Sequence, residues 1–297
     1  MPQEILVSVV LCTYNGAAFL DRQLKDILSQ TYSNIEVIIL DDCSSDETIA
    51  IAKKITQQDA RVTIVENTAT LGYNKNFEKG CCIAKGDIIA IADQDDAWAL
   101  NKIETMLKEY DGISLLMHCN SKKFFDKERP SFENKYKTKR FSGTRAEQLL
   151  FENTCEGHTM ILKQELLQYA LPFAEDLSYD WWLAVVAAAN GGVQWIDKTL
   201  VARRMHATNA SEVKKKHADK KQRVINRLSK FYTVPNLPAK AKEIISEAID
   251  KISNAPKSEI IGFFYKNRKI FFYYKHRPFP FISYSKAAKK MYKQICS

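Results

Sequence analysis

Residues 87–98 read DIIAIADQDDAW, a short apolar run that ends in a cluster of acids. The side chains of Asp93, Asp95 and Asp96 repel one another and raise each other's pKa, so the cluster costs stability unless it binds something. Carboxylate oxygens suit Mg²⁺ or Mn²⁺, which typically bind through one or two carboxylates and the phosphate oxygens of a substrate. The alternative is a helix start, where the dipole favours acids. A single acid would serve the helix, so three of them predict a cation site.

The sequence on either side alternates apolar runs with amphipathic segments. We expect strands at 5–12, 35–40, 61–66, 87–92 and 113–119, with helices near 17–30, 46–58, 74–84 and 99–110 between them. The apolar runs are continuous, which is typical of strands covered on both faces in a mostly parallel α/β sheet. Polar clusters follow three of the runs, namely TYN, DDCSSD and DQDD. Because ligands bind at the carboxyl ends of such strands, the three clusters predict one site.

The remainder of the chain is patterned less regularly. A basic segment at 120–145 is expected to form a hairpin or a loop. Beyond it we expect helices near 145–151, 163–170 and 179–190, strands at 193–197 and 199–205, and a helical region over 211–297.

The net charge of +9 conceals an asymmetry along the chain. Residues 212–297 contain 21 Lys/Arg and 6 Asp/Glu, a balance of +15, whereas residues 1–211 contain 23 and 29, a balance of −6.

The seven cysteines include no C-x-x-C pair, which argues against a metal cluster or disulfide framework and favours a reducing cytoplasm. The N-terminus lacks a signal-peptide pattern, and the longest apolar run, WWLAVVAAA, is about half the ~20 residues that a transmembrane helix needs. We therefore expect a soluble or peripheral protein.

The second polar cluster, DDCSSDET at 41–48, has a structural interpretation as well as a functional one. Ser44 and Glu47 match the S-x-x-E capping box of a helix that begins near Asp46. The box does not account for Asp41 and Asp42 at the end of the preceding strand. A carboxylate in that place can accept a hydrogen bond from a nucleobase N–H.

Two long segments together become specific. VSVVLCTYNGAAFLDRQLKDILSQTYSNIEVIILDDCSSDET and LGYNKNFEKGCCIAKGDIIAIADQDDAW resemble, over about residues 5–110, the nucleotide-sugar-binding half of family 2 glycosyltransferases. The resemblance implies a GT-A fold, which is a Rossmann-like, mostly parallel sheet flanked by helices. It also implies a nucleoside-diphosphate-sugar donor, a divalent cation (Mn²⁺ or Mg²⁺) and inversion at the anomeric carbon.

The resemblance also assigns roles to individual positions. In the family, the segment after the first strand lines the base pocket, the second acid of D-D-x-S hydrogen-bonds the base, and the first acid of D-x-D lies against the ribose. Carried onto this sequence, these donor-binding positions are Thr13, Tyr14, Asn15, Asp42 and Asp93. The last acid of D-x-D, here Asp95, meets the metal, and Asp96 is a further candidate for the metal shell.

Three other positions are compared with the family. Lys75 and Asn76 fall where it often has R-N near the nucleotide, with a solvated lysine and a helix-start asparagine as the alternative. Cys12 stands where a proline is common, a departure expected to matter little.

The second half resembles the acceptor part of the same family, most closely its rhamnosyltransferase-like bacterial members. The matching segments are YDWWLA at 179–184 and RMHATNAS at 204–211. The family's catalytic base corresponds to Asp180, with a helix N-cap as its structural role and Glu175 and Asp176 as reserve candidates. His206 is implied as a ligand of the diphosphate or the metal, with a structural histidine as the alternative.

The implied mechanism divides the work between two halves. A metal on Asp95 neutralises charge on the departing diphosphate, and Asp180 deprotonates the acceptor hydroxyl. Arg203, Arg204 or Lys75 can add positive charge, whereas Trp181 and Trp182 are expected in the core or in the acceptor-pocket wall.

Two domains are predicted. Residues 1–211 form a catalytic domain with a nucleotide-sugar-binding half (1–120) and an acceptor half (121–211). Residues 212–297 form a basic, aromatic-rich helical region.

The segment 257–297 interleaves Lys/Arg with Phe/Tyr. One interpretation is an interfacial segment on an anionic membrane, which would place the enzyme on the inner face of the cell membrane. The other is a helical appendage that packs on the catalytic domain or on a second copy in a homodimer. No nucleic-acid-binding motif accompanies the bases.

Other functions compete with a glycosyltransferase of cell-surface polysaccharide synthesis. A nucleotidyltransferase would normally carry a glycine-rich triphosphate segment near the N-terminus, and CTYNGAAF has one glycine. A non-catalytic carbohydrate-binding protein is disfavoured because the four acids 42, 93, 95 and 180 are all present. The donor sugar stays open among TDP-rhamnose, UDP-hexose and UDP-N-acetylhexosamine, and so does the acceptor, a glycan or a lipid-linked oligosaccharide.

Overall fold

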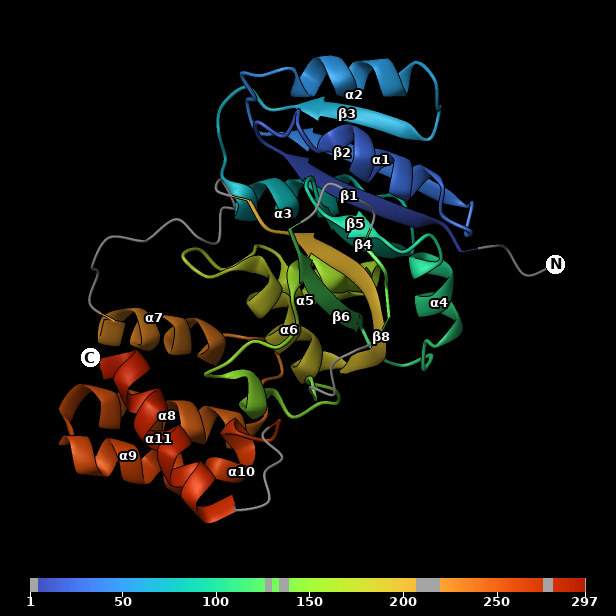
Figure 1. Cartoon of the computed structure of the whole chain (residues 1–297). Coiled ribbons are helices and arrows are strands. Elements are labelled where there is room, and N and C mark those ends of the chain that lie inside the picture. The colour runs from blue at the N-terminus through green and yellow to red at the C-terminus, as the bar shows by residue number, and fades with distance from the viewer. Residues whose placement is uncertain (1–4, 126–129, 134–138, 207–219, 275–279, 297) are drawn as a thin grey trace.

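The computed structural model describes residues 5–125, 130–133, 139–206, 220–274 and 280–296 (Figure 1). An eight-stranded sheet has the strand order β3-β2-β1-β4-β7-β6-β8-β5. Its strands are β1 (Val7–Thr13), β2 (Ile35–Asp41), β3 (Val62–Glu66), β4 (Ile88–Asp93), β5 (Ala97–Trp98), β6 (Leu116–Phe124), β7 (Met160–Lys163) and β8 (Val193–Arg204). β1 to β4 are parallel, β7 runs antiparallel to β4 and β6, β8 is parallel to β6, and β5 is antiparallel to β8.

Helices flank this sheet and form a separate layer below it (Figure 1). The α-helices are α1 (Leu20–Leu28), α2 (Thr48–Thr56), α3 (Tyr73–Ile83), α4 (Lys102–Lys108), α5 (Leu167–Ala170), α6 (Tyr179–Asn190), α7 (Lys220–Tyr232), α8 (Ala239–Asn254), α9 (Lys257–Lys266), α10 (Arg268–Phe271) and α11 (Pro280–Cys296). Short 3-10 helices are η1 (Ala146–Leu149), η2 (Gly157–Thr159) and η3 (Gln164–Leu166). The predicted α/β sheet flanked by helices, with a helical C-terminal region, is confirmed.

Successive residues of the central strands enter two separate cores. Val9 of β1 packs in one core with Leu24 of α1 and Ile103 of α4. Val10, the next residue, packs in the other core with Phe77 of α3 and residues of α6. Both faces of the sheet are therefore covered, which explains the continuous apolar runs of the sequence.

A glycine lets α3 approach the sheet closely. A Cβ atom on Gly80 would lie 2.4 Å from a methyl carbon of Val10 and 2.8 Å from one of Leu40. Any side chain at residue 80 would push α3 away from β1 and β2. Gly80 therefore sets how closely α3, and the loop before it, lies to the carboxyl ends of the strands.

The C-terminal helices share a hydrophobic core with the part of the chain that contains the sheet. Phe151, which follows η1, has ring centroids 5.0 Å from Phe264 and 4.8 Å from Phe271. These rings, together with Phe263 and Phe272, are buried. The phenylalanine rings of α9 and α10 thus pack on protein, while Tyr265 of α9 is partly exposed.

Several expectations from the sequence need correction. β5 and β7 were not predicted, the basic segment after 119 begins as an extension of β6 to Phe124, and β8 is one strand rather than two. The segment at 145–151 is a 3-10 helix, and 163–170 divides into η3 and α5. Short strands and single turns carry too little periodic pattern to be recognised, because their positions depend on the strands beside them.

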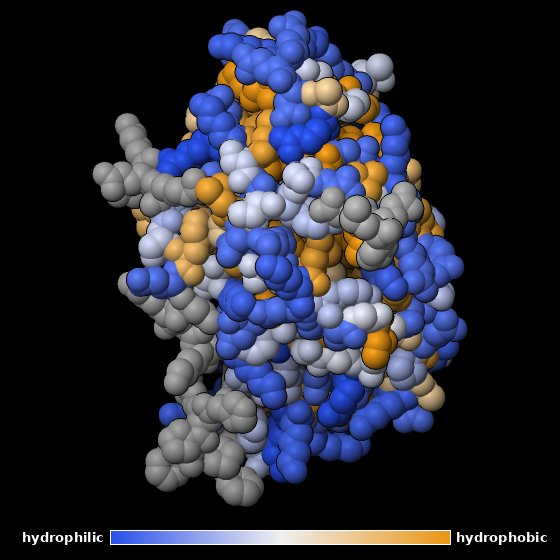
Figure 2. Space-filling view, turned by 90° about the vertical axis from the view of Figure 1, so that its right-hand side faces the viewer, coloured by the Kyte–Doolittle hydropathy of each residue, from blue (hydrophilic) through white to orange (hydrophobic). Residues whose placement is uncertain are grey.

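No helix among the described residues is long and apolar enough to cross a membrane. Figure 2 shows the side of the molecule that carries the N-terminus and α4. Hydrophilic residues cover most of this face, and hydrophobic residues show between them, mainly in its upper half.

Candidate active site

The three polar clusters lie at one edge of the sheet. Thr13 at the end of β1 is in register with Asp41 of β2, and Cys12 is in register with Asp93 of β4. The carboxyl ends of three parallel strands therefore bring TYN, DDCSSD and DQDD together, as the sequence predicted.

The loop after β1 is held by hydrogen bonds to the loop after β2. The Thr13 hydroxyl donates to Asp41 at 2.9 Å, and the Asn15 side-chain oxygen accepts the N–H of Ser45 at 2.8 Å. Asn15 has a φ of 47°, which asparagine tolerates better than most residues. Tyr14 between them is 54% exposed. Of the three predicted base-pocket residues, Tyr14 therefore presents its side chain outward, while Thr13 and Asn15 shape the backbone.

Gln94 joins this loop to the acidic cluster. Its amide accepts the N–H of Tyr14 at 2.9 Å and donates to the carbonyl oxygen of Tyr14 at 3.0 Å. A Cβ atom at Gly16 would lie 2.1 Å from the Gln94 side-chain oxygen, so any side chain there would displace the Gln94 amide. The sequence offered no signal for Gln94, which is the variable position of the D-x-D motif.

Ser44 does not form the predicted capping box with Glu47. Helix α2 begins at Thr48, and the side chain of Glu47, the residue before it, makes no capping hydrogen bond. Ser44 instead donates its hydroxyl and its N–H to Asp41 at 2.5 and 2.7 Å, while Asp46 accepts the N–H of Thr48 at 3.0 Å. Ser44 thus bonds to Asp41 three residues before it, and its hydroxyl accepts the N–H of Asn15 at 2.9 Å, instead of capping α2.

Asp42 is buried and holds the loop that leads into α3. Its carboxylate accepts the N–H groups of Leu71 and Gly72 at 2.7 and 2.8 Å and the amide of Asn67 at 3.0 Å. Gly72 has a φ of 79°, a conformation that suits glycine. Asp42 lies in the predicted place, and its contact with a nucleobase stays a prediction.

Lys75 and Asn76 differ in what they offer a ligand. Asn76 is buried, donates to the carbonyl oxygen of Leu40 at 3.0 Å and accepts the amide of Asn67 at 2.9 Å. It is neither a helix-start cap nor exposed to a ligand, because both ends of its amide bind protein. Lys75 is 41% exposed and pairs with Glu78 at 3.4 Å, so it retains room to reach a phosphate.

Asp95 and His206 come together from distant parts of the chain. The Nε2 atom of His206 lies 2.6 Å from a carboxylate oxygen of Asp95, and the His206 ring stacks on Phe19 with centroids 4.5 Å apart. Arg204 donates from Nε to the carbonyl oxygen of Asp95 at 3.1 Å. The two residues that the sequence named for the metal are therefore neighbours.

Asp96 points into the protein with one oxygen unsatisfied. Its Oδ1 atom accepts the N–H of Arg204 at 3.3 Å, and its Oδ2 atom is buried without a hydrogen-bond partner among the described residues. Burial, and then the charges of Asp93 and Asp95, raise the pKa of Asp96 well above its usual range. Burial deep in the site, followed by the charge of Asp95, raises the pKa of Asp93 to about 7, although 38% of its side chain is exposed.

His158 of η2 is a site residue that sequence reasoning missed. Ligand atoms of Asp93, Asp96 and His158 lie within 4.8 Å of one another, and the two atoms of His158 and Asp93 are 4.0 Å apart. Burial lowers the pKa of His158 to about 4, so its imidazole is neutral and can donate a lone pair. The orphaned oxygen of Asp96 beside a neutral imidazole fits a divalent cation.

Lys102, also missed, fixes the position of η2. Its ammonium group donates to the carbonyl oxygen of His158 at 3.1 Å and lies 3.3 Å above the ring of Trp98. The side chain is fully buried, and burial lowers its pKa to about 8. In the sequence this residue looks like any solvated lysine of a helix.

Asp180 lies in the first turn of α6. Helix α6 begins at Tyr179 after Ser178, so the N-cap role expected for Asp180 is wrong. Its carboxylate accepts the N–H of Trp181 at 2.7 Å. Burial raises the pKa of Asp180, while hydrogen bonds from the Ser178 side chain and from the N–H groups of Trp181 and Gly157 oppose that rise.

The other acids and aromatic residues of this segment fall elsewhere. Glu175 and Asp176 are exposed. Trp182 is buried and donates to the carbonyl oxygen of Ala170 at 2.8 Å, so it belongs to the core. Trp181 is half-buried, which leaves it available as a wall.

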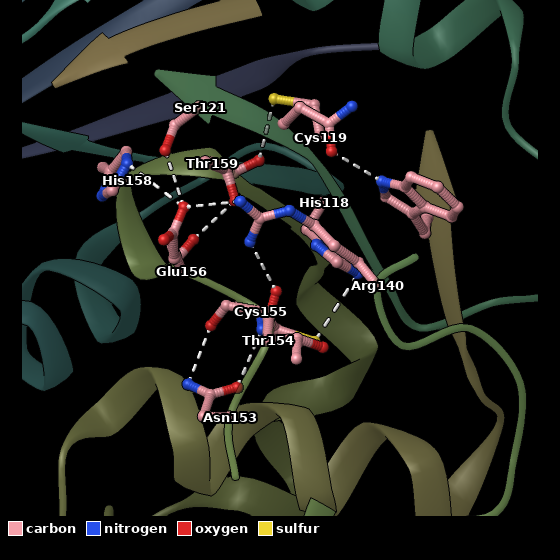
Figure 3. Close-up of polar contacts among 12 residues, drawn as sticks. His118, Cys119, Ser121, Arg140, Asn153, Thr154, Cys155, Glu156, His158 and Thr159 are labelled. Atoms are coloured by element: carbon pink, nitrogen blue, oxygen red, sulfur yellow. Dashed lines mark hydrogen bonds and ion pairs between the residues drawn. The ribbon is translucent and has the colours of Figure 1, made fainter. Parts of the chain in front are cut away.

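Glu156 is a further carboxylate in this region (Figure 3). It accepts the hydroxyl of Ser121 at 2.6 Å, pairs with Arg140 at 3.4 Å, and has an oxygen 3.9 Å from His158. The negative charge of Glu156 contributes to the raised pKa of Asp180. The Asp180 carboxylate accepts the N–H of Gly157, the residue that follows Glu156. No motif marks Glu156, because its partners come from β6 and from the loop before η1.

The parallel half of the sheet, with its acids at the carboxyl edge, and the mixed half that carries Asp180 define a GT-A glycosyltransferase fold. The sequence model of "Glycosyl transferase family 2" matches residues 8–169, more than half of the chain. The protein belongs to this family.

Similar proteins agree with that assignment. An "Uncharacterized glycosyltransferase" of Haemophilus influenzae is 28% identical over 85% of this chain and 82% of its own length. The Escherichia coli glucosyltransferase WfaP, described as "UDP-Glc:alpha-D-GlcNAc-diphosphoundecaprenol beta-1,3-glucosyltransferase", is 38% identical over 34% of this chain, which spans 40% of WfaP.

Solved structures share the fold at low sequence identity. The S. aureus TarS 1–349 structure in complex with UDP-GlcNAc has a TM-score of 0.66 and 16% identity, covering 98% of this chain and 92% of that one. The mannosyltransferase PcManGT of Pyrobaculum calidifontis, in complex with GDP-Man and Mn²⁺, has a TM-score of 0.57 and 16% identity, covering 99% and 86%. No more than the fold follows from such identities.

Proposed function

We propose that the protein transfers a sugar, with inversion, from a nucleoside diphosphate sugar to a hydroxyl group of a glycan or a lipid-linked acceptor. The observation that carries the proposal is the convergence of Asp93, Asp96 and His158 within 4.8 Å at the end of β4. The names of the relatives, among them WfaP and the Bacillus subtilis "Putative teichuronic acid biosynthesis glycosyltransferase TuaG", support a role in cell-surface polysaccharide synthesis.

The donor side consists of the loops after β1, β2 and β4. The exposed ring of Tyr14 is free to stack on a base, and Asp42 lies at the end of the neighbouring strand. Lys75, which is partly exposed on α3, can contact a phosphate. The complex of TarS with UDP-GlcNAc supports a nucleotide-sugar donor for this fold.

A divalent cation fits the acidic cluster. Asp93, Asp96 and His158 would hold it, with Asp95 beside them. When bound, such an ion neutralises the negative charge that develops on the leaving diphosphate. It also offsets the mutual repulsion of the carboxylates, which the fold otherwise opposes only in part.

Asp180 is proposed to act as the general base. A carboxylate with a raised pKa binds a proton more readily than an ordinary aspartate, which suits proton removal from a hydroxyl group. The acceptor oxygen passes its proton to Asp180 and forms a bond to the anomeric carbon. The bond between that carbon and the diphosphate oxygen breaks, and the nucleoside diphosphate leaves with the electron pair.

Family membership favours this reaction over the nucleotidyltransferase and the non-catalytic alternatives. The rhamnosyltransferase-like branch, a homodimer and contact with the inner face of the membrane stay predictions. The test is a panel of UDP-, dTDP- and GDP-sugars, each with Mn²⁺, Mg²⁺ or EDTA. We expect metal-dependent donor hydrolysis and thermal stabilisation with at least one donor, and no response to any of them would overturn the proposal.

A further inference from the structure

Helix α7 is basic, and two of its arginines have no acidic partner among the described residues. Its sequence, KKQRVINRLSKFY, contains five Lys/Arg and no Asp/Glu. Among the described residues, Arg223 and Arg227 make no hydrogen bond or ion pair with an acid, and the Nε atom of Arg227 is buried without any hydrogen-bond partner. A guanidinium removed from water without an anion is costly, and a bound anion would offset that cost.

Arg227 is fixed on an aromatic ring. Its guanidinium carbon lies 4.1 Å from the ring centroid of Trp181, a cation–π arrangement. The indole is itself held, because its N–H donates to the carbonyl oxygen of Leu149 at 2.6 Å and Phe231 packs 6.0 Å away. Burial, and then the charge of Arg223, lower the pKa of Arg227 to about 10, so the group remains a cation at neutral pH.

This arginine lies beside the acceptor side of the site. Trp181 directly follows Asp180, and its N–H binds the Asp180 carboxylate. Figure 1 shows α7 at the top of the C-terminal helices, facing α5 and α6. Trp181 therefore contacts both the proposed base, through its backbone N–H, and Arg227, through its indole ring.

We propose that Arg227, with Arg223 one helical turn before it, binds the phosphate or diphosphate group of the acceptor. The inference rests on the proposed function, since that function places an acceptor against Asp180. The planar guanidinium matches phosphate oxygens through paired hydrogen bonds, and an aromatic support keeps the fork in place. A lipid diphosphate and a soluble sugar phosphate share this chemistry. The basic C-terminal region then serves the acceptor.

The test is calorimetric titration of the full chain with inorganic diphosphate in EDTA, which weakens any metal-dependent binding on the donor side. We expect Arg227→Gln to weaken diphosphate binding at least tenfold. Arg227→Lys should have a smaller effect, because lysine keeps the positive charge and loses only the paired N–H donors of the guanidinium. Lys230→Gln, the same charge change on the exposed part of α7, should bind as the wild type does. Equal melting temperatures of the three variants would show that the fold is intact.

Geranyl diphosphate in a second titration distinguishes the sources. Tighter binding than inorganic diphosphate, lost in Arg227→Gln, assigns the site to a lipid-linked acceptor, and equal binding assigns it to a soluble one. Absence of diphosphate binding by the wild type, or unchanged binding by Arg227→Gln, would overturn the proposal. The donor assay contains no phosphate-bearing acceptor, so the proposed function can stand or fail separately.

Discussion

Asp180 is subject to two opposing influences at the start of α6. Burial favours the protonated carboxyl, whereas hydrogen bonds from Ser178, Trp181 and Gly157 favour the carboxylate. The balance leaves an ionisable group whose pKa is raised. At Asp93 burial and the charge of Asp95 raise the pKa, and at His158 burial lowers the pKa, so both groups are shifted toward their neutral forms.

Replacing Asp180 with Asn separates binding from chemistry. The amide keeps the shape but accepts no proton, so we expect sugar transfer to fall by about 10²–10⁴-fold. Nucleotide binding, measured by calorimetry with Mn²⁺, should be unchanged, because the proposed donor contacts lie on the loops after β1, β2 and β4 and not on α6. Asp176→Asn, an exposed neighbour, is the control. Retained transfer by Asp180→Asn would remove this residue from the mechanism.

His118 of β6 makes stability depend on pH. Its Nε2 atom donates to the carbonyl oxygen of Phe141 at 2.8 Å, and burial lowers the pKa of His118 to about 4 from an ordinary ~6.5. In the unfolded chain His118 binds a proton once the pH falls below ~6.5. In the folded chain it binds the proton only when the pH falls to about 4. Stability is therefore lost as pH falls from ~6.5 to ~4, by up to about 3 kcal/mol.

His118→Gln should remove this dependence, since an amide can still donate to Phe141 and does not titrate. Urea unfolding at several pH values between 4 and 7 measures the difference. We expect the variant to lose less stability than the wild type on acidification. The contribution of His158 to the pH dependence is the same in both proteins, so it cancels when the two are compared. Parallel curves for the two proteins would contradict the assignment.

At the scale of elements, the site depends on how closely α3 and η2 approach the sheet. Gly80 permits the first approach, and Lys102, bound to the carbonyl oxygen of His158, fixes the second. Neither contact is local in sequence. The loops carrying Asp42 and His158 are consequently placed by packing, and small changes at the interface should move them.

Two glycines in helices should respond oppositely to alanine. Gly80→Ala creates overlap with Val10 and should cost about 1–3 kcal/mol of unfolding free energy. Gly262→Ala on α9, where nothing lies within 4 Å of the new methyl group, should gain about 0.5–1 kcal/mol. Denaturant titration of both variants measures the difference. A gain in stability at residue 80 would show that α3 is not pressed against β1.

For the molecule as a whole, the C-terminal helices and the catalytic part share one hydrophobic cluster. Buried residues of α3, α6, α8 and α9 belong to it, and Phe151 joins the two parts. We therefore expect a single cooperative unfolding transition rather than an appendage that melts separately.

Phe151→Ala and Phe271→Ala test this coupling across the junction. Each removes a buried ring and should cost about 3–5 kcal/mol. The rings are 4.8 Å apart, so the double variant should lose less than the sum by about 0.5–3 kcal/mol. Calorimetry of all four proteins gives the coupling. Full additivity, or two separate transitions, would refute the shared core.

The fold was predictable where the pattern was long. Continuous apolar runs indicated β1 to β4, and the motifs at their ends indicated a single edge, because period and strand direction are local properties. The two-residue β5 and the four-residue β7 carried no such signal. The capping box at Ser44 was wrong because Ser44 bonds to Asp41 and to the N–H of Asn15, and the N-cap at Asp180 was wrong because α6 begins at Tyr179, after Ser178.

Composition and periodicity were enough to predict the sheet with its covering helices, the acidic edge and the basic C-terminal region, because they specify which faces are buried. Four features became evident only in the folded chain: His158 joins Asp93 and Asp96, Lys102 is buried, Asn76 binds protein, and Arg227 lies on Trp181. Each of these depends on residues far apart in the chain. Their contacts arise from packing, and packing is absent from any local pattern.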